Sequence, residues 1–187
     1  MEENKYMYFI PKMVDLGLPS GTLWADRNVG AEKPQDYGEY FRFGETEPYT
    51  EQSPKYRWRI YHESIGGTDL DVATVHFNRK CHTPTFEQIK ELHDNCSQEW
   101  TSLNGVNGIL VTGPNGKSIF FPAAGYRDCL YGAMKDVGLC GCYRSATPSA
   151  NYSGYRLIFS KKLWAYDSIL CVNGYSVRPV AQKGTFG

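Results

Sequence analysis

The pattern of apolar residues between positions 84 and 96 is helical. At the start of this segment, Thr85 and Gln88 have the spacing of a capping box, which satisfies free backbone N–H groups at a helix start. The residues that recur every three or four positions are Phe86, Ile89, Leu92 and Cys96. Because such residues share one face of a helix, the pattern predicts an amphipathic core helix here.

Short apolar runs between turn residues predict β structure elsewhere. Residues 108–112 and 117–121 flank Gly113-Pro114-Asn115-Gly116 and predict a hairpin. Residues 14–18 and 22–25 flank a Pro-Ser-Gly turn and predict a second, hairpin-like pair. Further strands are expected at residues 141–147, 155–160 and 175–180.

The stretch from residue 46 to residue 80 is mostly polar. Trp58, Tyr61 and Val75 are isolated apolar positions within it. This composition predicts a long loop with local turns, in which the three side chains act as anchors.

Length and composition limit the class of protein. A chain of 187 residues can bury a full hydrophobic core, so we assign residues 1–187 to a single domain, with 1–12 as an N-terminal extension. The 20 basic and 20 acidic side chains cancel, which argues against nucleic-acid binding. Aromatic residues reach 14%, and glycine is frequent, as is typical of a loop-rich β protein suited to recognition.

The chain offers no sign of a membrane span or a signal peptide. Its apolar runs fall short of the roughly 18 residues that a spanning helix requires, so we expect no membrane insertion. The N-terminal residues are acidic, and the apolar stretch after them is short for a signal peptide. Either the protein is not exported by this route, or the chain is a mature or excised part of something longer.

The cysteines do not have the spacing of a disulfide framework, and most are expected to be free thiols. Cys140 and Cys142 alone cannot close a tetrahedral zinc site. A candidate zinc cluster adds Cys81, His82, His93 and Cys96. Buried thiols and a satisfied histidine explain the same residues, so we expect no metal and no cofactor.

Other chemical motifs are incomplete. The Gly116-Lys117-Ser118 segment of a phosphate loop lacks its first glycine, because Val111 stands there. Glu45 and Glu47 are better explained as a solvated face than as calcium ligands, since calcium needs more oxygen atoms than their neighbours supply. No nucleophile and base have the spacing of a catalytic triad.

Several segments occur in the order typical of one known family. They are Val14-Asp15-Leu16-Gly17-Leu18-Pro19-Ser20-Gly21-Thr22-Leu23-Trp24-Ala25, Asn28-Val29-Gly30-Ala31, Asp36-Tyr37-Gly38-Glu39-Tyr40-Phe41-Arg42-Phe43-Gly44-Glu45-Thr46-Glu47-Pro48, Thr83-Pro84-Thr85, Glu99-Trp100-Thr101, Asn104-Gly105-Val106-Asn107-Gly108, Phe121-Pro122-Ala123-Ala124-Gly125-Tyr126-Arg127 and Ser176-Val177-Arg178-Pro179-Val180. By these segments, which together cover nearly the whole chain, it resembles the major paralogous domain family of gut Bacteroidetes. Cys81-His82 departs from the Trp-Arg that this family often has before Pro-Thr.

That family is similar to the C-type lectin fold, to the formylglycine-generating enzyme and to variable proteins of diversity-generating retroelements. The resemblance implies an α+β, C-type lectin-like domain in which the first and last strands pair. Here residues 14–18 and 176–180 would form that pair. A second small sheet would present the ligand-binding residues.

Residues 128–171 are the candidate variable region. In retroelement systems, adenine-directed mutation of Asn codons does not yield Glu, Gln, Lys, Met or Trp, and residues 100–181 contain neither Glu nor Gln. The residues that this mutation cannot reach, and that would have to be fixed, are Met134, Lys135, Lys161, Lys162 and Trp164. Ordinary strand and loop composition is the competing explanation.

The expected function is non-catalytic binding of a protein or glycan receptor on another cell or surface. Irregularly placed rings and charged groups between two ordered segments are typical of a displayed binding surface. The residues expected to contact the ligand are Asp128, Tyr131, Lys135, Asp136, Tyr143, Arg144, Tyr152, Tyr155, Trp164, Tyr166 and Asp167. Large rings are often buried, so core packing also explains part of this set.

Other functions stay open. One is a carbohydrate-binding domain of fixed specificity, although the triplets of calcium-dependent sugar lectins are missing. Another is a structural surface domain, which would have a mostly polar exposed face. A formylglycine-generating-like oxidase rests on Cys140, Cys142 and fold analogy alone. The location expected for a binding module of this kind is the cell surface, as an adhesin, or a virion.

Overall fold

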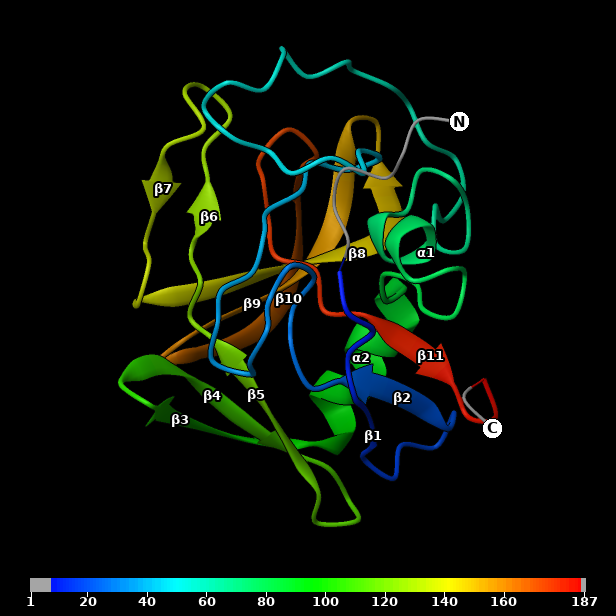
Figure 1. The fold of residues 1–187 in the computed structure, drawn as a ribbon, viewed down its shortest axis with the longest axis vertical. Coiled ribbons are helices and arrows are strands. Elements are labelled where there is room, and N and C mark those ends of the chain that lie inside the picture. Colours follow the sequence, from blue (N-terminus) through cyan, green and yellow to red (C-terminus); the bar gives the residue numbers. More distant parts are fainter. Residues whose placement is uncertain (1–7, 186–187) are drawn as a thin grey trace.

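The computed structural model describes residues 8–185, which form a small, mostly-β domain of four small sheets (Figure 1). Within these residues the helices are α1 (Val72–His76) and α2 (Phe86–Asn95). The expected α+β class therefore fits only loosely, because strands dominate. Residues 1–7 of the proposed N-terminal extension lie outside the described residues.

The two ends of the described chain meet in one sheet. Its strands are β1 (Met13–Asp15), β2 (Thr22–Ala25) and β11 (Val180–Gln182), in the order β1-β2-β11. The predicted hairpin-like pair at the start of the chain is confirmed by β1 and β2. The predicted pairing of residues 14–18 with 176–180 is wrong in detail, because β2 lies between β1 and β11. Trp24 of β2 pairs with Val180.

A second sheet is a three-stranded meander of β3 (Ser97–Leu103), β4 (Val106–Thr112) and β5 (Ser118–Pro122). The predicted β4–β5 hairpin is confirmed, with Thr112 opposite Ser118 around the glycine-containing turn. Strand β3 was not expected from the sequence, because its side chains are polar or only half-buried. It is held as an edge strand by its pairing with β4.

The third sheet, in the order β10-β9-β8, holds β8 (Cys140–Ala150), β9 (Ser153–Ser160) and β10 (Leu163–Leu170). The strands predicted at 141–147 and 155–160 are confirmed by β8 and β9. Strand β10 was not predicted. The short ribbon of β6 (Tyr126–Arg127) and β7 (Met134–Lys135) forms the fourth sheet. The strand predicted at 175–180 is not continuous: Tyr175 and Ser176 form isolated bridges, residues 177–179 have no regular structure, and Val180 opens β11.

The predicted helix and its capping box are confirmed by α2. The backbone N–H of Gln88 donates to Thr85 Oγ1 at 3.3 Å, and the backbone N–H of Thr85 donates to Gln88 Oε1 at 2.9 Å. Ile89 and Leu92 are the buried residues of α2. They place the helix against the main core, next to the third sheet.

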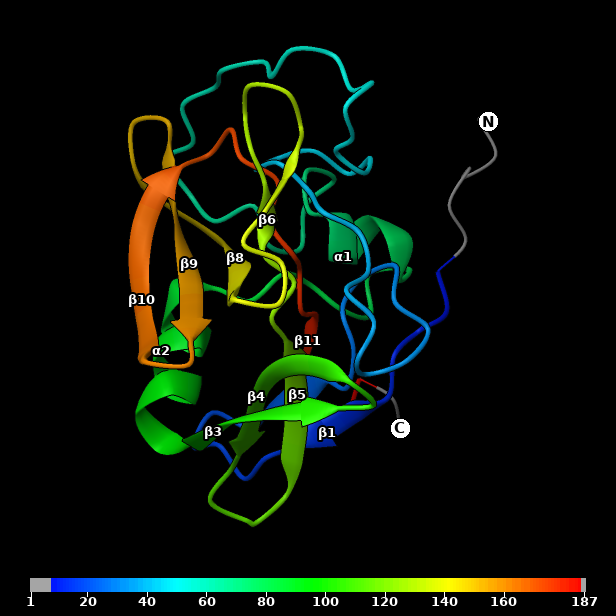
Figure 2. The ribbon, with the colours of Figure 1, turned by 90° about the vertical axis from the view of Figure 1, so that its left-hand side faces the viewer.

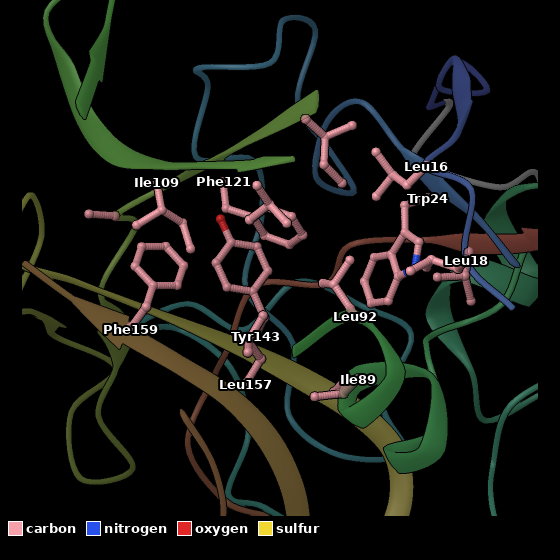
Figure 3. Packing of buried hydrophobic residues seen from close by; sticks show 14 residues of the cluster. Leu16, Leu18, Trp24, Ile89, Leu92, Ile109, Phe121, Tyr143, Leu157 and Phe159 are labelled. Atoms are coloured by element: carbon pink, nitrogen blue, oxygen red, sulfur yellow. The ribbon is translucent and has the colours of Figure 1, made fainter. Parts of the chain in front are cut away.

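The main core lies where α2, the terminal sheet, the meander and the third sheet meet. Figure 3 shows rings from different strands across this core, with Tyr143 and Phe121 between Phe159 and Trp24. The ring centroids of Phe121 and Tyr143 are 5.0 Å apart. Burial of large rings at this junction fixes the sheets relative to one another.

The long loop predicted at 46–80 is confirmed in part. It crosses one end of the molecule without regular structure and then forms α1, which is too short to give a periodic pattern. At this same end lie the turn between β6 and β7 and the turn between β8 and β9 (Figures 1 and 2). We use the name loop end for residues 46–63, 128–133, 150–153 and 170–173. Over residues 8–185, neither helix is long and apolar enough to cross a membrane.

Candidate functional site

A groove of about 700 Å³ runs across the loop end. One wall comes from residues between 49 and 58, and the other from residues 129–131 together with Leu170 and Val172. The large side chains exposed along it are Trp58 (52%), Leu130 (77%), Tyr131 (77%) and Leu170 (50%). Exposed rings and aliphatic groups gathered around one concavity are typical of an interaction site.

The turn at residues 128–133 holds Leu130 and Tyr131 outward. The Asp128 carboxylate accepts the backbone N–H of Leu130 at 3.2 Å and that of Tyr131 at 2.9 Å. These hydrogen bonds and the neighbouring positive charge of Lys135 lower the pKa of Asp128, with the Tyr131 N–H as the largest cause. Arg127 Nη1 also donates to the Gly132 carbonyl at 2.6 Å. The turn therefore displays two apolar side chains in a fixed geometry.

Trp58 is held by one ring from its own loop and by one ring from the turn between β8 and β9. Its ring centroid lies 5.4 Å from that of Tyr56 and 5.5 Å from that of Tyr152, with interplanar angles of 82° and 89°. Tyr56 is fixed in turn, because its hydroxyl donates to the Phe43 carbonyl at 2.9 Å. Trp58 thus presents a large ring surface whose orientation is set before any ligand arrives.

Arg42 forms the floor beneath the groove. Its Nε donates to Glu45 Oε2 at 2.6 Å, and its guanidinium lies 4.3 Å from the ring centroid of Tyr49. Tyr49 is buried, and this burial raises the pKa of its hydroxyl. Because ion pair and ring contacts satisfy Arg42 from within the protein, it supports the wall and is not a free cation of the groove.

The structure brings part of the sequence-predicted set to the loop end. Tyr131 and Tyr152 are exposed there, while Asp128 and Lys135 form an ion pair of 3.6 Å behind the 128–133 turn. Asp136 lies beyond β7 in the turn that leads into β8, with a positive φ of 54°. Asp128 has a structural task in this arrangement, because it fixes the turn that carries Tyr131.

Another part of the set packs on α2. The Tyr155 ring stacks on Phe86 with centroids 3.9 Å apart, and the Trp164 ring stacks on His93 at 5.5 Å. Tyr166 meets the same two α2 rings edge-on. These three side chains are half-buried and hold the helix on the third sheet, away from the groove.

Tyr143 and Arg144 correct the sequence interpretation, because neither side chain is displayed. Both are buried within the sheets and α2 that carry the loops, which we call the frame. The Tyr143 hydroxyl donates to the Pro122 carbonyl at 2.8 Å, and burial raises the pKa of Tyr143 to about 12. Arg144 Nη2 donates to the Asn173 carbonyl at 2.7 Å, and its guanidinium lies 4.7 Å from the ring centroid of Tyr175. Their places on β8, close to the junction of the sheets, leave no side-chain surface for a ligand.

Asp167 lies on the exposed face of the third sheet. It pairs with Arg156 through two contacts of 2.7 and 3.0 Å, directly across β9 and β10. Asp167 is accessible, but it is separate from the groove lining.

No family model, curated protein or solved structure matches the chain. The assignment of a function therefore depends on the geometry of the loop end and on the residues themselves.

The cysteines are free thiols in the structure. The Cys142 thiol hydrogen-bonds to Cys140 and thereby lowers the pKa of Cys140, while the same contact and burial raise the pKa of Cys142. Burial raises the pKa of Cys81 to about 12. Over residues 8–185, no group of three or more His, Cys, Asp or Glu side chains is placed to hold a metal ion.

Trp58, Leu130 and Leu170 are site residues that the sequence interpretation missed. Trp58 was expected to anchor a long loop, yet half of it is exposed. The available signal was local. Lys55-Tyr56-Arg57-Trp58-Arg59 alternates basic and aromatic residues, which is unusual for a loop whose side chains merely anchor it.

Proposed function

We propose that the protein is a non-catalytic binding module whose loop end contacts a protein or glycan receptor on another cell or surface. The observation that carries this proposal is the grouping of exposed Trp58, Leu130, Tyr131 and Leu170 around one groove of about 700 Å³. Rigid aromatic anchors supply most of the binding energy at recognition sites, and here their positions are fixed by hydrogen bonds and ring contacts.

The frame beneath this surface supports the same proposal. Tyr143 and Arg144 are buried on β8, and Trp164 packs on α2, so the sheet and helix carry the loops without taking part in contact. A binding module of this kind belongs at the cell surface, as an adhesin, or on a virion. A C-type lectin-like fold is part of the proposal, and the pairing of β11 with β2, which unites the chain ends, favours it.

Diversification by a retroelement is a further part of the proposal. It predicts that exposed positions of residues 128–171 vary, while buried positions in the same stretch stay fixed. Trp164, which this mutation cannot produce, has a structural place against His93, as a fixed position should have. The position of Leu130 and Tyr131 at the tip of a braced turn suits variation, because their side chains contact solvent more than the frame.

A binding experiment tests the proposed surface. Labelled protein is applied to a panel of bacterial cells and to a glycan array, alongside a triple variant, Trp58→Ala with Leu130→Ala and Tyr131→Ala. The control removes exposed apolar groups elsewhere, by Val137→Ala, Leu139→Ala and Leu163→Ala. The triple variant is expected to lose at least about 100-fold in affinity, since each anchor contributes on the order of 1–2 kcal/mol, while the control binds as wild type. Equal binding by all three proteins would exclude the loop end as the site.

Sequencing separates diversified from fixed specificity. The gene is sequenced deeply across a population of its source, and amino-acid variation is recorded at each position. Variation at Leu130, Tyr131 and Tyr152, with Tyr143, Arg144 and Trp164 constant, is the expected result. Uniformly low variation would exclude diversification and leave a domain of fixed carbohydrate specificity, which the exposed ring of Trp58 outside the 128–171 region favours, or a structural surface domain.

A further inference from the structure

The segment Lys55-Tyr56-Arg57-Trp58-Arg59 separates two hollows of the loop end. Lys55 and Trp58 line the groove of about 700 Å³ described above. Arg57 and Arg59 line a second hollow of about 380 Å³. Tyr56 lines both. Trp58 and Lys55 therefore face one hollow, and Arg57 and Arg59 face the other, so a ring surface and cationic groups lie within a few residues of each other.

The cations of this segment are exposed. Across residues 8–185, Lys55, Arg57 and Arg59 make no hydrogen bond or ion pair with another residue. Each of the other arginines donates at least one hydrogen bond to another residue. These other arginines are Arg27, Arg42, Arg79, Arg127, Arg144, Arg156 and Arg178. Two neighbouring arginines without an ion-pair partner, placed along one hollow, are suited to an anionic ligand. The planar guanidinium group matches the geometry of a carboxylate or a sulfate.

The acidic residues of the second hollow limit what that ligand is. Glu45, Glu47 and Asp69 line it together with Arg57 and Arg59. A ligand with a continuous chain of phosphates would meet these carboxylates and be repelled. A sugar chain with separated acidic groups avoids that conflict, since its acids reach the arginines while its hydroxyls donate hydrogen bonds to the carboxylates.

We propose that the ligand of the loop end is an acidic glycan, whose carboxylate or sulfate groups bind Arg57, Arg59 and Lys55 while a sugar ring packs on Trp58. This inference rests on the proposed function, because it assigns the ligand class of the same surface. Trp58 is suited to the stacking role, since perpendicular contacts with Tyr56 and Tyr152 hold its ring and leave half of it exposed.

The test measures affinity for defined probes by titration calorimetry. The probes are an oligogalacturonate octasaccharide, which carries carboxylates, a heparin octasaccharide, which carries sulfates, a neutral maltooctaose, and a single-stranded oligo-dT of 20 nucleotides. At least one acidic oligosaccharide is expected to bind at least about tenfold more tightly than the neutral one, with an affinity that falls as salt rises. The probe that binds shows whether carboxylate or sulfate is recognised.

Matched variants locate the effect. Lys55→Gln with Arg57→Gln and Arg59→Gln removes three positive charges from the segment. Lys117→Gln with Lys161→Gln and Lys162→Gln removes three from exposed turns at the far ends of the β4–β5 and β9–β10 hairpins. The first variant is expected to bind the acidic oligosaccharide roughly 10- to 100-fold more weakly, and the second to bind as wild type. Trp58→Phe is expected to retain binding that Trp58→Ala loses.

Three results would overturn the acidic-glycan assignment. These are no binding of either acidic oligosaccharide, an equal loss of affinity in the two charge variants, or binding of oligo-dT as tight as that of the acidic sugar. The last result would assign the segment to single-stranded nucleic acid. The cell and array experiment with the Trp58, Leu130 and Tyr131 triple variant reads out the proposed function separately, so a binding surface with a neutral or protein ligand stays detectable.

Discussion

The hydroxyl of Tyr49 donates a hydrogen bond of 2.9 Å to the backbone carbonyl of Asp128. This contact joins the long loop at residues 46–63 to the turn at 128–133, segments that lie far apart in the sequence. Gly132 packs against the backbone of Thr50 at the same junction. The two walls of the groove are therefore connected, and the buried side chain of Tyr49 helps to set their spacing.

Tyr49→Phe should loosen the groove without unfolding the protein. Loss of one partly buried hydrogen bond costs about 1 kcal/mol of unfolding free energy. Amide hydrogen exchange is expected to speed up at residues 128–133 and binding to weaken, while the rest of the exchange pattern is unchanged. Tyr166→Phe is the matched control, because its ring packs on α2 away from the groove. Unchanged exchange at 128–133 in the Tyr49 variant would show that other contacts set the spacing.

Arg178 donates hydrogen bonds to three other residues, and its replacement is expected to destabilise the folded protein. Its guanidinium donates to Asn28 Oδ1 at 2.8 Å, to the Ala25 carbonyl at 3.1 Å and to the Phe120 carbonyl at 2.9 Å, and it lies fully buried. Arg178→Met leaves these acceptors unsatisfied and should lower the free energy of unfolding by about 3 kcal/mol or more. Urea denaturation measures the change. Arg79→Met, at an exposed ion pair, should cost under about 1 kcal/mol, and similar values for both variants would contradict this role.

Local sequence signals predicted a helix and a hairpin whose hydrogen bonds join residues close to one another in the sequence. Thr85 and Gln88 marked the start of α2, and the glycine-containing turn marked the β4–β5 hairpin, because their hydrogen bonds join near neighbours. The same signals missed β3 and β10, which have half-exposed side chains and are strands because a partner strand pairs with them. Strand status there is set by tertiary context.

The candidate site was predictable only in part, for a related reason. Tyr131 and Tyr143 are the same residue type in the same irregular stretch, yet one is at the tip of a turn and the other is in the core. Burial depends on which strand face meets Phe121, and no local pattern encodes that contact. Trp58 was misassigned because its exposure follows from the path of the long loop, which has few periodic residues to define it.

Two glycines of one hairpin turn should respond differently to alanine. At Gly113 an added Cβ would lie 2.0 Å from the Leu16 carbonyl oxygen, which belongs to the backbone and cannot move aside. At Gly116 it would meet nothing within 4 Å, although φ there is +81°. Gly113→Ala is expected to cost about 3 kcal/mol of unfolding free energy, and Gly116→Ala about 1 kcal/mol for the left-handed backbone. Thermal or urea unfolding of both variants tests the order, and a larger loss at Gly116 would contradict it.

Stability should fall in alkaline solution. Burial raises the pKa of Tyr40, Tyr49, Tyr56, Tyr143 and Tyr175 above the ordinary value of 10.0. A group whose pKa is higher in the folded state than in the unfolded state contributes its full stabilisation at pH values below its pKa in the unfolded state. This contribution to the free energy of unfolding is lost as the pH rises through the pKa of the folded state. The free energy of unfolding is therefore expected to be insensitive to these tyrosines below about pH 9 and to decline above about pH 10. Urea denaturation across this range, with tyrosinate absorbance as the readout, measures it; a flat profile to pH 11.5 would contradict the burial argument.

Thiol reactivity tests the oxidase alternative. Cys129 is exposed, and the pKa of Cys140 is lowered by its hydrogen bond from the Cys142 thiol, so iodoacetamide should modify these two in the native protein. Cys81, Cys142 and Cys171 have raised pKa values through burial or the thiol contact and should react only after unfolding. Mass spectrometry of the alkylated peptides gives the order. Cys140→Ser is expected to leave binding at the loop end unchanged, because the groove lining does not include Cys140. If the wild-type protein oxidised a peptide substrate and Cys140→Ser did not, Cys140 would be a catalytic thiol. That result would overturn the non-catalytic assignment.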